Sequence, residues 1–161
     1  MTIRQATADE MLSLWEYEDY DDASLNGKFF YKNIVSKKAE FWTIEEDGRL
    51  IGELYPFFDM EDSDFASGKD TAYLCAFRIE EKFRGQGLGT RLITAVMEDL
   101  KKRGFHGVTI GVDENEEQNL RLYMRLGFTQ KIKDCYEDPC DVDKEMKPRK
   151  CKPFLLLYKE L

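Results

Sequence analysis

The stretch Arg84-Gly85-Gln86-Gly87-Leu88-Gly89-Thr90 joins an apolar run at 73–79 to a periodic apolar run at 88–100. A glycine-rich segment between these two patterns predicts a turn between a β-strand and an α-helix. The first N–H groups of a helix have no partner within it, and the aligned peptide dipoles add positive charge at that end. Glycine also lets a ligand approach the backbone closely. The stretch therefore predicts a binding site for a phosphate or pyrophosphate group.

Three phosphate-binding patterns compete for this turn. The dinucleotide fingerprint G-x-G-x-x-G would require glycine at position 90, where Thr90 stands, and a Walker loop would require a Gly-Lys-Ser/Thr ending that is absent. The pattern [Gln/Arg]-x-x-Gly-x-[Gly/Ala] fits Arg84, Gly87 and Gly89 fully. Taken alone, these residues also allow a turn that binds nothing.

The fitting pattern is the acetyl-CoA pyrophosphate loop of the GCN5-related N-acetyltransferase (GNAT) superfamily, which this chain resembles. A second point of resemblance is Leu122-Tyr123-Met124-Arg125-Leu126-Gly127-Phe128, which matches the second half of the family's Asn-x-x-Ala-x-x-Leu-Tyr-x-x-x-Gly-Phe. In the first half, Asn119 stands at the alanine position and Asn115 lies one residue early. The resemblance covers residues 71–130, and the flanks agree in the order of their elements.

The resemblance implies direct transfer of an acetyl group from acetyl-CoA to a primary amine of a small molecule or peptide. It also implies which residues hold the cosubstrate. Backbone groups of the central strand pair with the pantetheine arm, the turn holds the pyrophosphate, and a polar residue after the next strand contacts the pantetheine; these are Phe77, Ile79, Arg84, Gly85, Gln86, Gly87, Leu88, Gly89, Thr90 and Asn115. No metal is expected.

The catalytic groups are predicted from the needs of acyl transfer. A lysine-like amine is protonated at pH 7, so a base must accept its proton before it attacks. Glu53, on the strand before the central one, and Glu80, just beyond the central strand, are the candidates. The departing thiolate gains from a nearby proton donor, which we expect to be Tyr123.

The pattern of elements predicts an α/β fold with a mixed, mostly antiparallel sheet flanked by helices. The resemblance implies that this sheet is splayed at the acetyl-CoA site. Asp47-Gly48 between two β-prone runs predicts a hairpin, and helices are expected at 25–35, 88–100 and 116–126. A polar loop is expected at 56–70 and a long charged insertion at 133–152. Residues 1–161 are expected to form one N-acetyltransferase domain.

Composition narrows the choice of partners. With 24 basic and 32 acidic residues, the chain has a net charge of 24 − 32 = −8, which disfavours nucleic acid and favours a cationic acceptor. No apolar run is long enough to span a membrane and the first residues lack a signal-peptide pattern, so we expect a cytoplasmic protein without membrane partners. Its four cysteines are then expected to be thiols, and Cys135, Cys140 and Cys151 lack zinc-site spacing. The sequence leaves open whether the protein is a monomer or a homodimer.

Two rival functions remain at this point. The first is a non-catalytic acyl-CoA-binding sensor or interaction module with the same turn. Tyr123 favours the enzyme, whereas the uncertain base keeps this rival open. The second is a nucleotide-binding module, which would be stabilised against heat by ATP or NAD but not by CoA.

Overall fold

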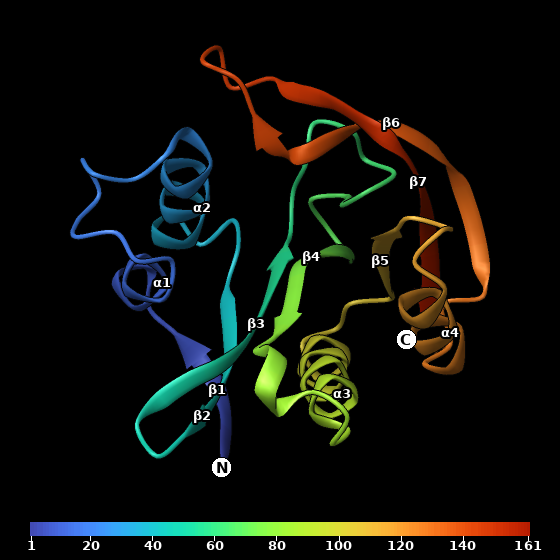
Figure 1. Ribbon diagram of the computed structural model, residues 1–161. Coiled ribbons are helices and arrows are strands. Elements are labelled where there is room, and N and C mark those ends of the chain that lie inside the picture. Colours follow the sequence, from blue (N-terminus) through green and yellow to red (C-terminus); the bar gives the residue numbers. More distant parts are fainter.

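All seven strands lie in one sheet, in the order β1-β2-β3-β4-β5-β7-β6, in the computed structural model, which describes residues 1–161 (Figure 1). Every neighbouring pair is antiparallel except β4 and β5, which are parallel. This confirms the predicted mixed, mostly antiparallel sheet. In chain order the elements are β1 Thr2–Ala6, α1 Ala8–Leu14, α2 Leu25–Val35, β2 Phe41–Glu46, β3 Arg49–Phe57, β4 Thr71–Ile79, a 3₁₀ turn Glu81–Phe83, α3 Leu88–Lys102, β5 Gly107–Val112, α4 Glu117–Arg125, β6 Gln130–Val142 and β7 Pro148–Glu160.

Local sequence signals account for several element boundaries. Thr7 caps α1 through a capping box, in which its hydroxyl accepts from the Glu10 N–H while the Glu10 carboxylate accepts from the Thr7 N–H. Asp47 and Gly48 turn the β2–β3 hairpin with φ of 49° and 76°. Two positive φ values suit this dipeptide, which is why Asp-Gly between two strands predicted the turn.

Two hydrophobic cores lie on opposite faces of the sheet. On one face α3 and α4 pack on the strands, and the six apolar side chains of the predicted α3 stripe are all buried: Leu88, Leu92, Ile93, Val96, Met97 and Leu100. The other core joins α1 and α2 to the sheet through Met11, Phe30 and Tyr55, and it also contains Cys135 and Cys140 of β6. Figure 1 shows α1 and α2 beside the β1–β3 end of the sheet.

The prediction of a long charged insertion at 133–152 is wrong. These residues are most of a β-hairpin, because β6 and β7 are each 13 residues long and pair from Gln130↔Tyr158 to Val142↔Pro148. Three register shifts interrupt the pairing, and such bulges bend a strand. The hairpin extends past β5 toward α2 (Figure 1), where β6 contacts that helix.

The segment at 56–70 also differs from the predicted solvated loop. Pro56 and Phe57 belong to β3, and Phe65 and Ala66 are buried. The Thr109 hydroxyl donates to the Phe65 carbonyl at 2.6 Å and so fixes the loop against β5. All four cysteines are free, as expected. None of the helices combines the length and apolar character that crossing a membrane requires.

Candidate active site

The sheet opens where β4 and β5 part. They pair only from Thr71↔Gly107 to Leu74↔Ile110, so the edge of β4 that faces β5 has no strand partner beyond Leu74. On the other edge, two β4 residues, Ala76 and Phe77, lie opposite the single β3 residue between Glu53 and Tyr55. Ala76 has a φ of 54°. This bulge turns the last residues of β4 relative to the first and separates the two parallel strands.

The turn after β4 presents a row of unpaired backbone donors. None of the six N–H groups from Gly85 to Thr90 donates to another group of the protein, and the first bond of this region is from the Arg91 N–H to the Gly87 carbonyl. Gly87 is the N-cap of α3, and Gly85 and Gly87 have φ of 80° and 76°. Donors of this kind at a helix start fit an anionic oxygen cluster.

Two contacts fix this turn against the sheet. The Arg84 Nε donates to the Ile79 carbonyl at 2.8 Å, which ties the turn to the end of β4. A Cβ on Gly89 would lie 2.7 Å from the Phe77 ring, so glycine allows α3 to begin directly against that ring. By contrast, a Cβ on Gly85 or Gly87 would meet nothing within 4 Å. The space in front of these two glycines is therefore open to a ligand.

A cleft of about 840 Å³ lies between the end of β4, this turn and the start of α4. All the residues predicted to hold acetyl-CoA line it except Gln86. Arg78, Arg84 and Arg125 also lie on its wall, together with Glu116 and Glu117. We refer to this space as the donor cleft.

Tyr123 is buried between the donor cleft and a second, smaller cleft. Its ring contacts Phe77 of the donor cleft, at 6.3 Å between centroids, and Phe128, at 6.2 Å. Its hydroxyl has no hydrogen-bond partner, and the residue lines a cleft of about 260 Å³ at the end of β5. Burial and the nearby Glu116 carboxylate raise the pKa of Tyr123, so the hydroxyl stays protonated at neutral pH.

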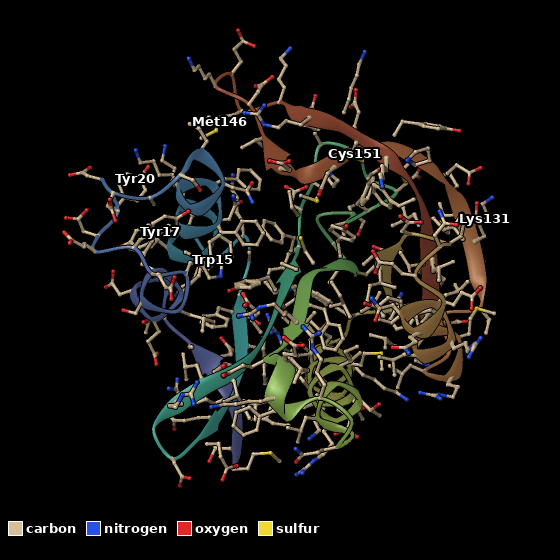
Figure 2. The ribbon with its side chains drawn as sticks, in the orientation of Figure 1. Trp15, Tyr17, Tyr20, Lys131, Met146 and Cys151 are labelled. Carbon is tan, nitrogen blue, oxygen red and sulfur yellow. The ribbon has the colours of Figure 1, made fainter.

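Glu53 is held by three side chains on the face that carries α1 and α2. Its Oε1 accepts from Trp15 Nε1 and from the Tyr55 hydroxyl, both at 2.8 Å. Its Oε2 accepts from Arg78 Nε at 2.9 Å, and Arg78 Nη2 lies 2.9 Å from the same oxygen as its ion-pair partner. Figure 2 shows Trp15 beside α1, turned toward the sheet. A carboxylate with both oxygens accepting in this way orients Arg78.

Glu80 lies outside both clefts. Its two oxygens accept from Arg49 at 2.8 and 3.0 Å, and Lys82 lies 3.8 Å away. Glu53 does not line either cleft. The assignment of either carboxylate as the general base stays a prediction.

Comparison with known proteins identifies the family. The model of the Acetyltransferase (GNAT) family matches residues 2–128, which is most of the chain. The chain belongs to the GNAT family. This confirms the resemblance that the two motifs indicated. The seven-stranded sheet with its parted parallel pair is thus the GNAT fold.

Two relatives and one solved structure show how far the likeness extends. An uncharacterized N-acetyltransferase of Methanocaldococcus jannaschii is 27% identical over 143 residues, covering 81% of this chain and 61% of the relative. A spermine/spermidine N(1)-acetyltransferase of Bacillus subtilis is 31% identical over 84 residues, covering 51% of this chain and 54% of the relative. The chain thus spans less than two thirds of the length of either relative.

The solved structure is that of a GNAT family acetyltransferase from Elizabethkingia anophelis with acetyl-CoA bound. It has the same fold, with a TM-score of 0.64 and 22% identity over 99% of this chain and 97% of that one. No group of three or more His, Cys, Asp or Glu side chains in our structure could hold a metal ion.

One part of the site has no counterpart among the residues predicted from sequence. Asp138 of β6 lines the smaller cleft together with Tyr123. In the sequence, Asp138 was one of several acidic residues in the supposed insertion. Only the bend of the hairpin brings it to the end of β5, and no local pattern signals that approach.

Proposed function

We propose that the protein is an acetyl-CoA-dependent N-acetyltransferase that moves the acetyl group to a primary amine by direct attack. The observation that carries this proposal is the row of six unpaired N–H groups from Gly85 to Thr90, because five of these six residues line the donor cleft. Such a row needs an anionic partner, and the pyrophosphate of acetyl-CoA supplies several oxygens close together.

The remainder of the cosubstrate follows the parted strands. The unpaired edge of β4 beyond Leu74 offers backbone groups to the amides of the pantetheine arm, as an added strand would. Phe77 and Ile79 are the residues of this edge that line the donor cleft. Asn115 lies on the opposite wall. In this placement the thioester approaches Tyr123, whose ring touches Phe77.

The chemistry needs a neutral amine and a stabilised leaving group. The amine nitrogen forms a bond to the thioester carbonyl carbon, and the carbon–sulfur bond then breaks with its electron pair on sulfur. Tyr123 donates its proton toward that sulfur. Because burial keeps its hydroxyl protonated, this donor is available throughout the neutral pH range.

We also propose that the acceptor is cationic, that residues 1–161 act as one N-acetyltransferase domain, and that the protein is cytoplasmic. The net charge of −8 supports the first, as does the spermine/spermidine specificity in the name of the Bacillus subtilis relative. The single continuous sheet supports the second. A non-catalytic acyl-CoA-binding module is the alternative, because both clefts would serve binding equally well.

Thiol release tests the proposal. The protein is incubated with acetyl-CoA and a panel that contains spermidine, short diamines, amino acids and peptides with free N-termini, and free CoA is followed. We expect CoA release that depends on one class of amine, with the acetylated amine found by mass spectrometry. Tight binding of acetyl-CoA without release for any amine would favour the binding module. ATP or NAD stabilising the protein where CoA does not would instead support the nucleotide-binding rival.

A further inference from the structure

The smaller cleft lies where the two cores meet at the end of β5. Its walls come from β4, β5 and the residue after it, α4, and both arms of the hairpin. It shares Glu116 and Asn119 with the donor cleft. Figure 2 labels Cys151, which lies on the β7 arm over this region. The two clefts therefore adjoin along the start of α4, and Tyr123 lines the smaller one while its ring contacts Phe77 of the donor cleft.

Two tyrosine hydroxyls in this cleft lack a partner. Tyr73 and Tyr123 are each only 5% exposed, and neither hydroxyl makes a hydrogen bond within the protein. Only one side-chain polar atom, Oδ1 of Asn26, is fully buried without a hydrogen bond. The two tyrosine hydroxyls are therefore not fully buried, and they keep contact with the cleft. Buried hydroxyls are normally hydrogen-bonded, and here both are left for a ligand.

Asp138 is the third polar group of the cleft. It is half-buried, accepts the Cys140 N–H at 2.9 Å and has no cation within ion-pair distance. Its neighbour Asp141, by contrast, lies 3.7 Å from Arg149. Burial raises the pKa of Asp138. Burial is the main cause of the raised pKa of Tyr73, and the Asp138 charge adds to it. The carboxylate thus lies near the unpaired Tyr73 hydroxyl without a positive partner.

The charges around the cleft favour a cation. Asp113 and Glu116 line it beside Asp138, whereas Lys152 is its one basic residue. Asp113 and Asp138 each accept one backbone N–H at 2.9 Å, and the exposed Glu116 accepts from the Asn119 amide. Asp138 differs in that burial raises its pKa, so we take it as the candidate base. A raised pKa makes a half-buried carboxylate a stronger proton acceptor than an ordinary aspartate.

We propose that this smaller cleft is the acceptor site, and that Asp138 binds the primary ammonium group and takes its first proton. The inference rests on the proposed function. The neutral nitrogen then attacks the thioester carbon. Its second proton replaces the one that Tyr123 gives to the departing sulfur, and Asp138 releases the first proton to water. The products are the acetylated amine, CoA thiol and one proton, so the step balances without a further reactant.

The key variant is Asp138→Asn, which keeps an oxygen for the Cys140 N–H and removes the charge. Asp141→Asn is the matched control, because it removes a neighbouring carboxylate outside the cleft lining. At pH 7, with spermidine or the amine found in the panel, we expect kcat/KM to fall roughly 10²-fold in Asp138→Asn. The control should stay within about twofold, since surface ion pairs contribute little. Asp138→Glu should restore part of the activity.

The pH profile separates a base from a structural residue. The other titratable groups of the cleft are Tyr73, Asp113, Glu116, Tyr123, Cys151 and Lys152. A carboxylate with a raised pKa limits the wild-type rate on the acidic side, because only its ionised form accepts a proton. The deficit of Asp138→Asn should shrink toward pH 10, where the amine loses its proton unaided. A structural loss would give the same deficit at every pH.

Binding measurements distinguish this inference from the proposed function. We expect acetyl-CoA affinity in Asp138→Asn to equal that of the wild type, while spermidine binding to the CoA complex weakens at least about tenfold through loss of the ion pair. Normal kcat/KM in a folded Asp138→Asn, or equal losses in the Asp141 control, would overturn the acceptor site and leave the acetyltransferase intact. A wild type that neither releases CoA nor binds spermidine would overturn both.

Discussion

The donor cleft and the smaller cleft, which we call the acceptor cleft after its proposed role, adjoin at Glu116 and Asn119 but are built by different means. The donor cleft is made mostly of backbone: six consecutive N–H groups, two left-handed glycines and the free edge of one strand. The acceptor cleft is made of side chains from β4, α4, β6 and β7. A short continuous segment is enough to build the first, whereas the second exists only after a long hairpin has bent over the sheet.

This difference matches what each cleft has to recognise. A pyrophosphate offers the same oxygens in every reaction, so fixed backbone donors serve it whatever the neighbouring side chains are. An acceptor amine differs between enzymes in shape and charge. Side chains carried by a hairpin can change without disturbing the turn. Four predictions test this division, beginning with Tyr123, which lines the smaller cleft and contacts Phe77 of the donor cleft.

Tyr123→Phe is expected to give the largest effect. The change keeps the ring between Phe77 and Phe128 and removes only the proton donor. Acetyl-CoA and amine binding should change little, while kcat falls by roughly 10²–10⁴. The deficit should shrink with an acyl donor whose leaving thiol has a lower pKa. A stable variant with normal kcat would show that the sulfur takes its proton elsewhere, whereas lower thermal stability with weaker binding would indicate a packing role.

Gly87→Asp is expected to affect the donor cleft alone. It places a negative charge where the pyrophosphate should lie and forces a φ of 76° on a non-glycine residue. Acetyl-CoA affinity should fall at least about tenfold, measured by calorimetry. Gly48→Asp is the matched control, because Gly48 has the same φ of 76° and also has open space around it, in the β2–β3 turn. If both variants lose affinity equally, general destabilisation of the fold rather than loss of the pyrophosphate site is the cause.

These two residues also show what the sequence could predict. Gly87 and Tyr123 lie in patterns shorter than 15 residues, and the strand, turn and helix around Gly87 depend on local spacing. Local patterns therefore selected residues that line the donor cleft, and their binding of acetyl-CoA stays a prediction. The middle of the hairpin, at 133–152, was missed because nearly all of its side chains are polar, charged or half-exposed, which hides the alternation of a strand. Asp138 could not be selected from its acidic neighbours, since Tyr73 and Tyr123, which line the same cleft, lie 65 and 15 residues earlier in the chain.

Tyr73→Phe should affect the acceptor cleft alone, and less strongly. The hydroxyl has no partner within the protein, so its removal should leave the melting temperature unchanged or slightly higher. If the hydroxyl hydrogen-bonds the acceptor, KM for the amine should rise about 2- to 10-fold with acetyl-CoA affinity unchanged. An unchanged KM would remove Tyr73 from the acceptor site.

Ionic strength should give the smallest effect. With acetyl-CoA saturating, kcat/KM for a cationic amine should fall by roughly two- to fivefold as KCl screens the acidic surface. The control is an uncharged competitor of similar size, added at constant KCl. It shows how far kcat/KM falls when the cleft is simply occupied and the ionic strength does not change. Salt-independent kinetics, or a preference for acidic acceptors, would contradict a cationic acceptor.

The register shift between Asp138 and Val142 has a consequence for how substrate preference could change in evolution. Asp138 pairs with Arg149 and Val142 pairs with Pro148, so the three β6 residues between them have no register partner on β7. Loss of one of them would change the bend of the hairpin beside Asp138 while the pairing on either side re-forms. One deletion could thus exchange one acceptor for another in a single step and leave acetyl-CoA binding untouched. A variant lacking Pro139, assayed against the amine panel, would show whether the hairpin acts as such an interchangeable part.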